Sequence, residues 1–184
     1  MNYRRIVAVI VVVALAASLI LNFNFYLYTR AQNENVVNNM MTRALGSYAL
    51  QINTAEYFLN TYLDTKNRSL IENEASWCAY GAAVAADVCR QSSSREMYNQ
   101  LWNTAIALRS FALYYVGLGG NINETKLIHA ISALDEIWRF FAGIEIANNE
   151  NPIDYLTEII GANATATVIH YCQIAQDNLP SPIY

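Results

Sequence analysis

Apolar residues recur at alternating steps of four and three along most of this chain, and no proline occurs before Pro152. That spacing places apolar side chains on one face of an α-helix and is typical of helices that pack at shallow angles. A β-sandwich would show turn signals about every eight to twelve residues, whereas Gly46 and Gly81 are the only glycines between Arg30 and Val116. The sequence therefore predicts an all-α fold.

The pattern is carried by five stretches, at residues 37–62, 71–89, 97–118, 127–141 and, more weakly, 153–175. A glycine-rich segment, residues 117–120, ends the third stretch, and Asn121 or Asn123 can cap the next one. Because connections this short favour antiparallel neighbours, we predict an antiparallel bundle of four to five helices over residues 30–178, followed by a C-terminal tail, 179–184. The expected core positions of the third stretch are Met97, Leu101, Thr104, Leu108, Phe111, Tyr115 and Leu118.

Residues 6–28 form the most apolar segment of the chain. The first sixteen of them carry no charge and only one polar side chain, Ser18. A helix of this length spans about 34 Å, which is enough to cross the hydrocarbon layer of a membrane. Arg4 and Arg5 precede the segment, and basic residues favour the cytoplasmic side. We predict that residues 6–28 are a transmembrane signal-anchor helix.

This topology places residues 1–5 in the cytoplasm and the rest of the chain after the helix outside it. A cleaved signal peptide is the alternative, since a basic start and a short apolar core are also its hallmarks. The small residues Ala14, Ala16 and Ala17 are followed by further apolar residues, whereas a cleavage site normally follows the apolar core. The uncleaved anchor is therefore favoured, and both interpretations predict an extracytoplasmic domain.

Composition excludes several classes of protein. The chain of 184 residues is 54% hydrophobic with a net charge of −4, which is too apolar for intrinsic disorder. Eleven basic residues against fifteen acidic ones leave no basic surface for nucleic acid, so no nucleic-acid partner is expected. Three cysteines are too few for a disulfide scaffold.

The cysteines allow one disulfide. Cys78 and Cys89 lie on one predicted helix, about 16 Å apart along its axis, which is beyond disulfide reach. A bond must therefore involve Cys172, and in an up-and-down bundle Cys78 and Cys172 both lie near the end far from the membrane. We predict a Cys78–Cys172 disulfide, with three reduced core cysteines as the alternative.

Few residues indicate chemistry. Asn67 and Asn123 begin Asn-x-Ser/Thr triplets in predicted loops and are candidate glycosylation sites. The two histidines, His129 and His170, form neither a Glu-x-x-His nor a His-x-x-x-His pair. We therefore expect no metal, no cofactor and no catalytic activity.

The chain is rich in aromatic residues, with 13 Tyr, 6 Phe and 3 Trp. Trp77, Trp102 and Trp138 lie at or beside the apolar faces of three helices, so core filling is the favoured interpretation and a ligand cage the alternative. We expect a membrane-anchored, non-catalytic bundle at the cell surface that binds a protein partner or self-assembles. The alternatives are a small-molecule sensor that acts through a membrane partner and a secreted protein released by signal-peptide cleavage.

Overall fold

The computed structural model describes the backbone of residues 3–92, 95–147 and 162–180, and the side-chain surroundings of residues 18–92, 95–142 and 163–180. In this part of the chain there are five α-helices and no strand, which confirms the all-α prediction. Two π-helical turns, η1 and η2, extend two of the helices. The elements are α1 (Tyr3–Thr65), η1 (Leu70–Ala75), α2 (Ser76–Ser92), α3 (Glu96–Ser110), η2 (Phe111–Val116), α4 (Glu124–Ala147) and α6 (Ala162–Asn178).

The chain divides into two units, Met1–Asn38 and Asn39–Tyr184. In the first unit, every described side chain from Ser18 to Val37 is exposed. Among the residues with described surroundings, no helix has an apolar stretch long enough to cross a membrane. Residues 6–17, the first half of the predicted membrane helix, lie outside that part of the chain. The large exposed apolar side chains of the second half are Leu19, Ile20, Leu21, Phe23, Phe25, Tyr26, Leu27 and Tyr28.

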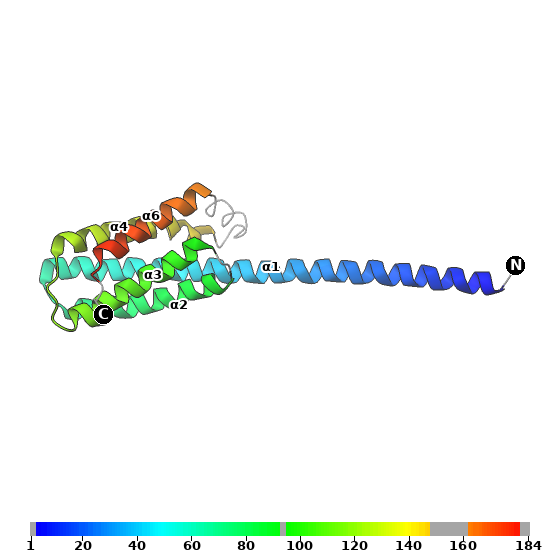
Figure 1. The fold of residues 1–184 in the computed structure, drawn as a ribbon, viewed down its shortest axis with the longest axis horizontal. Helices are drawn as coiled ribbons and strands as arrows, with labels where there is room; N and C mark the ends of the chain where they lie inside the picture. The colour runs from blue at the N-terminus through cyan, green and yellow to red at the C-terminus, as the bar shows by residue number, and fades with distance from the viewer. Residues whose placement is uncertain (1–2, 93–94, 148–161, 181–184) are drawn as a thin grey trace. The chain divides into compact units, whose positions relative to one another are not determined.

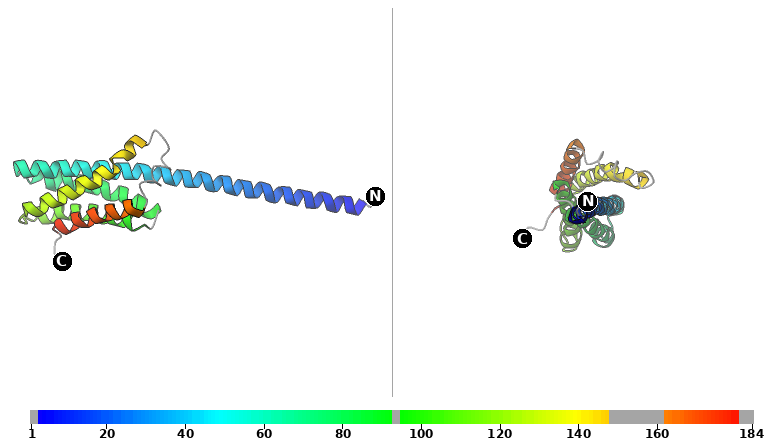
Figure 2. Two further views of the ribbon diagram at one scale, coloured as in Figure 1. Left: turned by 90° about the horizontal axis from the view of Figure 1, so that it is seen from above. Right: turned by 90° about the vertical axis from the view of Figure 1, so that its right-hand side faces the viewer.

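The second unit is a helical bundle. Followed by colour in Figure 1, its successive helices alternate in direction. α2 packs along α3, and α6 packs against both α3 and α4. The views in Figures 1 and 2 agree in placing α4 and α6 side by side. The bundle is thus held together by neighbouring antiparallel helices and by the contact between α3 and α6.

The core of the bundle is continuous, and Tyr48 of α1 is among its largest side chains. This side chain is fully buried, and its hydroxyl donates a hydrogen bond to the carbonyl oxygen of Leu101 in α3 at 3.0 Å. Its ring meets the edge of Phe141 in α4, with the ring centres 6.5 Å apart. One tyrosine therefore connects three helices.

A polar contact links α3 to α6 inside this mostly apolar interface. The side-chain amide of Gln176 donates to Oε1 of Gln100 at 3.1 Å and to Oγ1 of Thr104 at 3.0 Å. Thr104 is fully buried, and its hydroxyl donates to the carbonyl oxygen of Gln100 at 2.9 Å. These bonds satisfy polar groups that would otherwise be costly to bury.

Most of the core positions predicted for the third stretch are confirmed, and the errors lie in and just after η2. Met97, Leu101, Thr104, Leu108 and Phe111 are buried as expected. Beyond them Val116 is buried, whereas Tyr115 is half-buried and Leu118 is 83% exposed. A π-helical turn contains one more residue than an α-helical turn allows. η2 therefore shifts the buried face by one residue, which the regular steps of four and three could not anticipate.

The connection between η2 and α4 agrees with the sequence. Gly119 has a φ of +80°, a backbone conformation that glycine adopts without strain. Oδ1 of Asn123 accepts the backbone N–H of Lys126 at 3.2 Å, which caps the first turn of α4. The start of the fifth predicted stretch, residues 153–161, lies outside the described residues, and α6 covers the remainder.

Candidate functional site

An open groove of about 390 Å³ lies between α2 and α3, at the end of the bundle where the two π-helical turns meet. η1 and η2 pack against each other, and both supply residues to the groove. π-helical turns occur frequently at functional sites, so their presence on both sides of one groove marks it as a candidate. Its lining residues are Glu72, Asn73, Ser76, Trp77, Tyr80, Arg109 and Leu113.

Two exposed aromatic rings form one wall of the groove. Trp77 is 72% exposed and Tyr80 is 45% exposed. Their rings meet edge to face, with centres 6.3 Å apart and planes at 83°. Val84 continues this exposed surface one turn further along α2. We call Trp77, Tyr80 and Val84 the α2 outer stripe.

The α2 outer stripe corrects the expectation that all three tryptophans fill the core. Trp102 and Trp138 are partly buried and pack against the core, whereas Trp77 does not. The sequence contained a signal that could have identified this. At 100° per residue, the centre of the row formed by Trp77, Tyr80 and Val84 lies about 150° around the helix from the midpoint of the buried Cys78 and Ala82. α2 thus has two apolar faces, of which the bundle covers one.

Two arginines cross between α2 and α3 and rest on aromatic rings. The guanidinium of Arg109 in α3 lies 4.8 Å from the ring centre of Tyr80 in α2. The guanidinium of Arg90 in α2 lies 4.6 Å from the ring centre of Trp102 in α3. Each contact is a cation–π interaction, in which the positive charge is attracted to the face of the ring. Each of the two helices therefore supplies one arginine that contacts an aromatic ring of the other.

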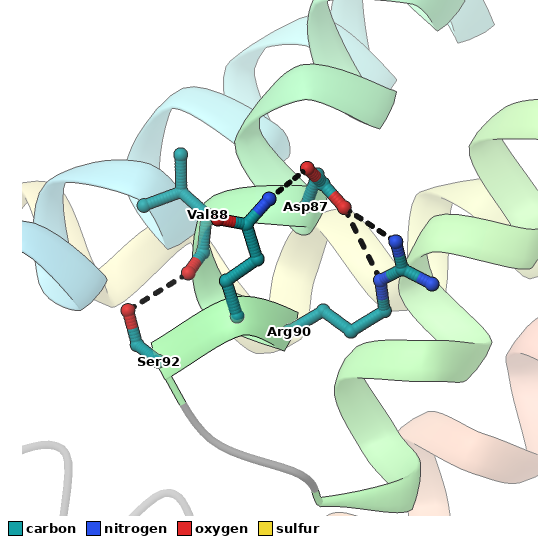
Figure 3. A network of polar contacts seen from close by, with 5 residues as sticks. Asp87, Val88, Arg90 and Ser92 are labelled. Atoms are coloured by element: carbon teal, nitrogen blue, oxygen red, sulfur yellow. Dashed lines mark hydrogen bonds and ion pairs between the residues drawn. The ribbon is translucent and has the colours of Figure 1, made fainter.

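The two arginines differ in their ion pairs. Arg90 donates to Oδ1 of Asp87 from Nη2 at 2.7 Å and from Nε at 3.2 Å (Figure 3). Asp87 also accepts a hydrogen bond from the side chain of Gln91 at 2.6 Å. Arg109 has no ion pair with any residue that the structure describes, although Glu72 lines the same groove. The groove therefore presents a cation without a carboxylate partner.

The three cysteines are free and buried in the structure. Cys78 lies on α2 and Cys172 on α6, and each of these helices packs against α3. Burial raises the pKa of the Cys89 and Cys172 thiols to about 12, so both are protonated at neutral pH and pack as small apolar groups. The structure does not join Cys78 to Cys172, and their disulfide stays a prediction.

The candidate glycosylation sites are both exposed and both lie in connections. Asn67 lies between α1 and η1, where its Oδ1 accepts hydrogen bonds from the backbone N–H and the hydroxyl of Ser69 at 3.2 Å and 2.8 Å. Asn123 lies immediately before α4. His129 and His170 are exposed on α4 and α6. In the described part of the chain, no three His, Cys, Asp or Glu residues gather in a way that could hold a metal ion.

A second hollow, of about 500 Å³, lies along α1 between Asn53 and Asp64. All of its lining residues belong to that one helix. Burial, followed by the charge of Asp135, raises the pKa of Glu56 in this hollow, and the hydrogen bond from Asn60 opposes the shift. Because a single helix surface forms no walls around a ligand, the groove between α2 and α3 is the stronger candidate.

No protein-family model matches the chain, and neither a curated protein nor a solved structure matches it.

Proposed function

We propose that this chain is a membrane-anchored, non-catalytic helical bundle that binds a protein partner through the groove between α2 and α3. The observation that carries the proposal is the exposure of Trp77 and Tyr80 beside Arg109, which has no ion pair with any described residue. Tryptophan, tyrosine and arginine are the residue types that contribute most binding energy at protein interfaces. Such residues are strong anchors when a partner surface removes them from water.

The proposed anchor is the segment 6–28, with Arg4 and Arg5 on the cytoplasmic side and the bundle outside. Two features support it: the uncharged apolar sequence of residues 6–17 and the row of exposed apolar side chains from Leu19 to Tyr28. Aromatic residues are enriched at membrane–water interfaces, and Phe23, Phe25, Tyr26 and Tyr28 would lie at the outer one. Lipid would then cover the apolar surface that the first unit leaves exposed.

The membrane location is tested with an epitope tag placed after Tyr184. We expect the tagged chain to stay with membranes during an alkaline wash and the tag to be accessible to protease in intact cells. A tag that is protected until the cells are opened would contradict the proposed topology. The intact mass of the purified chain separates the uncleaved anchor from a secreted form that has lost residues of the N-terminal segment.

Partner binding is tested by placing a photo-reactive amino acid at Trp77, in cells that also produce a second copy with a different tag. Tyr57 of α1 is the matched control position, because it is an aromatic residue with 64% exposure that does not line the groove. We expect a discrete adduct from position 77 and none from position 57. An adduct that carries the second tag identifies self-assembly. Equal adducts at both positions, or none at 77, would contradict the proposal.

A small-molecule sensor is the second candidate, and one observation favours it. A volume of about 390 Å³ lies within the range of small-ligand sites. Such sites usually enclose most of the ligand surface, whereas Trp77 on this groove is largely exposed. A flat or convex partner surface covers such a side chain better than a small molecule does.

A further inference from the structure

We infer that the segment of the protein partner that enters the groove carries an acidic side chain for Arg109, next to apolar side chains for the α2 outer stripe. This inference rests on the proposed function and deepens it, because it names the chemistry of the partner. It is drawn from three features of the groove: an arginine that has no ion pair with a described residue, a row of exposed apolar side chains, and the polar acceptors that η1 supplies.

The charge of the partner follows from comparing Arg109 with Arg90. Both guanidinium groups rest on an aromatic ring at similar distances, 4.8 Å and 4.6 Å. Arg90 in addition has Asp87 as its carboxylate, whereas Arg109 has none among the described residues. A guanidinium on an aromatic ring keeps its edge N–H groups free, and their geometry matches the two oxygens of a carboxylate. An Asp or Glu of the partner would give Arg109 the same set of contacts that Arg90 has.

The apolar part of the partner follows from the α2 outer stripe. Trp77, Tyr80 and Val84 occur at steps of three and four, so they form one row along the outer face of α2. A protein segment that lies along the helix can place successive apolar side chains on this row, as peptides do in aromatic-lined and helix-binding grooves. The proposed segment therefore combines apolar residues with one acid.

The polar groups of the groove favour a protein segment over an acidic sugar. Asn73 and Glu72 lie on η1 at one end, where their oxygens can accept N–H groups of a peptide backbone. Along the rest of the row the exposed residues are apolar or aromatic. A sugar needs hydrogen-bond partners around its whole ring, whereas a peptide needs them only at intervals.

The inference is tested by selecting from a library of random 12-residue peptides with the full chain in detergent. We expect the selected peptides to contain Asp or Glu beside proline, aromatic or aliphatic residues. A charge-assisted hydrogen bond changes binding affinity by about tenfold or more. Arg109→Gln should therefore lower the affinity for the selected peptides by about tenfold. Trp77→Ala should lower this affinity by at least as much. Higher salt should lower the affinity of the wild-type chain, because salt screens the charge of Arg109.

The matched controls are Arg90→Gln and Tyr57→Ala. The first removes the other ring-bound arginine, and the second removes an exposed aromatic residue that does not line the groove. Both should leave peptide binding within about twofold of wild type, because the contacts they remove are outside the proposed site. Circular dichroism spectra of all four variants should match wild type, since none of the four side chains belongs to the buried core.

The outcomes separate the inference from the proposed function. Peptides that depend on Trp77 but contain no acid, or that bind Arg109→Gln as well as wild type, would overturn the inference and leave the proposed function standing. An absence of peptides that depend on Trp77 would overturn both. Binding to acidic glycans on an array, lost in Arg109→Gln and without any selected peptide, would replace the protein segment by a sugar and overturn the inference.

Discussion

Two fully buried tyrosines of the bundle core, Tyr48 and Tyr98, should respond in opposite ways to loss of the hydroxyl group. Tyr48 and Tyr98 are both fully removed from solvent. The Tyr48 hydroxyl donates to the carbonyl oxygen of Leu101 at 3.0 Å, whereas the Tyr98 hydroxyl has no hydrogen-bond partner among the described residues. Tyr48→Phe therefore removes a satisfied hydrogen bond, and Tyr98→Phe removes an unsatisfied polar group.

The magnitudes follow from these surroundings. A neutral hydrogen bond contributes about 1 kcal/mol net to the free energy of unfolding, so Tyr48→Phe should lower that free energy by roughly this amount. A buried hydroxyl without a partner costs about 1–3 kcal/mol of desolvation, so Tyr98→Phe should leave stability unchanged or raise it within that range. Tyr48→Ala should cost about 3–5 kcal/mol, since it also removes the ring that contacts Phe141.

The measurement is urea unfolding of the full chain, followed by circular dichroism at 222 nm, with each variant beside wild type. An unchanged denaturant slope shows that only stability has changed. For a domain of this size, 1 kcal/mol corresponds to about 2–4 °C in Tm. The reasoning is refuted if Tyr98→Phe loses as much stability as Tyr48→Phe, or if Tyr48→Phe is neutral.

Three further predictions follow from burial. Cys89, Cys172 and Tyr98 each have a pKa raised to about 12 in the folded state. The ordinary pKa is 9.0 for Cys and 10.0 for Tyr, so above these values the unfolded chain releases protons that the folded state keeps. These three groups should therefore leave the free energy of unfolding constant between neutral pH and about pH 9 and lower it as the pH rises towards 12, as measured by urea titrations across this interval. In thiol titrations of the folded chain, neither Cys89 nor Cys172 should react, because both are buried. After denaturation without a reducing agent, the chain should show three reactive thiols if all cysteines are free. It should show one, that of Cys89, if Cys78 and Cys172 form a disulfide. Trp77→Ala should change the Tm by no more than about 2 °C, because the side chain is 72% exposed.

Much of the fold was predictable because helix periodicity is a local property of the sequence. The buried positions of α1 include Tyr48, Ile52 and Leu59, all of which follow from steps of four and three. The shift from Tyr115 to Val116 at η2 was not predictable in this way. η1 and η2 pack against each other although they are far apart in the sequence, and no local pattern in either segment specifies this contact.

The candidate site was less accessible than the fold. Residue type alone favours burial of Trp77, and only its angular position on α2 indicates otherwise. The contacts of Arg109 and Arg90 depend on how α2 and α3 align, because each arginine reaches a ring on the other helix. The hydrogen bond from Tyr48 to Leu101 likewise joins residues 53 positions apart. Such pairings are set by tertiary structure, and one sequence does not specify them.

The two faces of α2 separate what the helix needs for folding from what it offers for binding. Its inner face is lined by small side chains, including Cys78, Ala82 and Cys89, which pack closely against the neighbouring helices. Because that face already completes the core, the bundle does not require large apolar residues on the opposite one. Trp77 and Tyr80 are nonetheless there, and apart from their contact with each other and the guanidinium of Arg109 on Tyr80 they expose apolar surface to water. An exposed apolar row, beside an arginine that has no ion pair among the described residues, is better explained by a surface that another protein covers than by a requirement of folding.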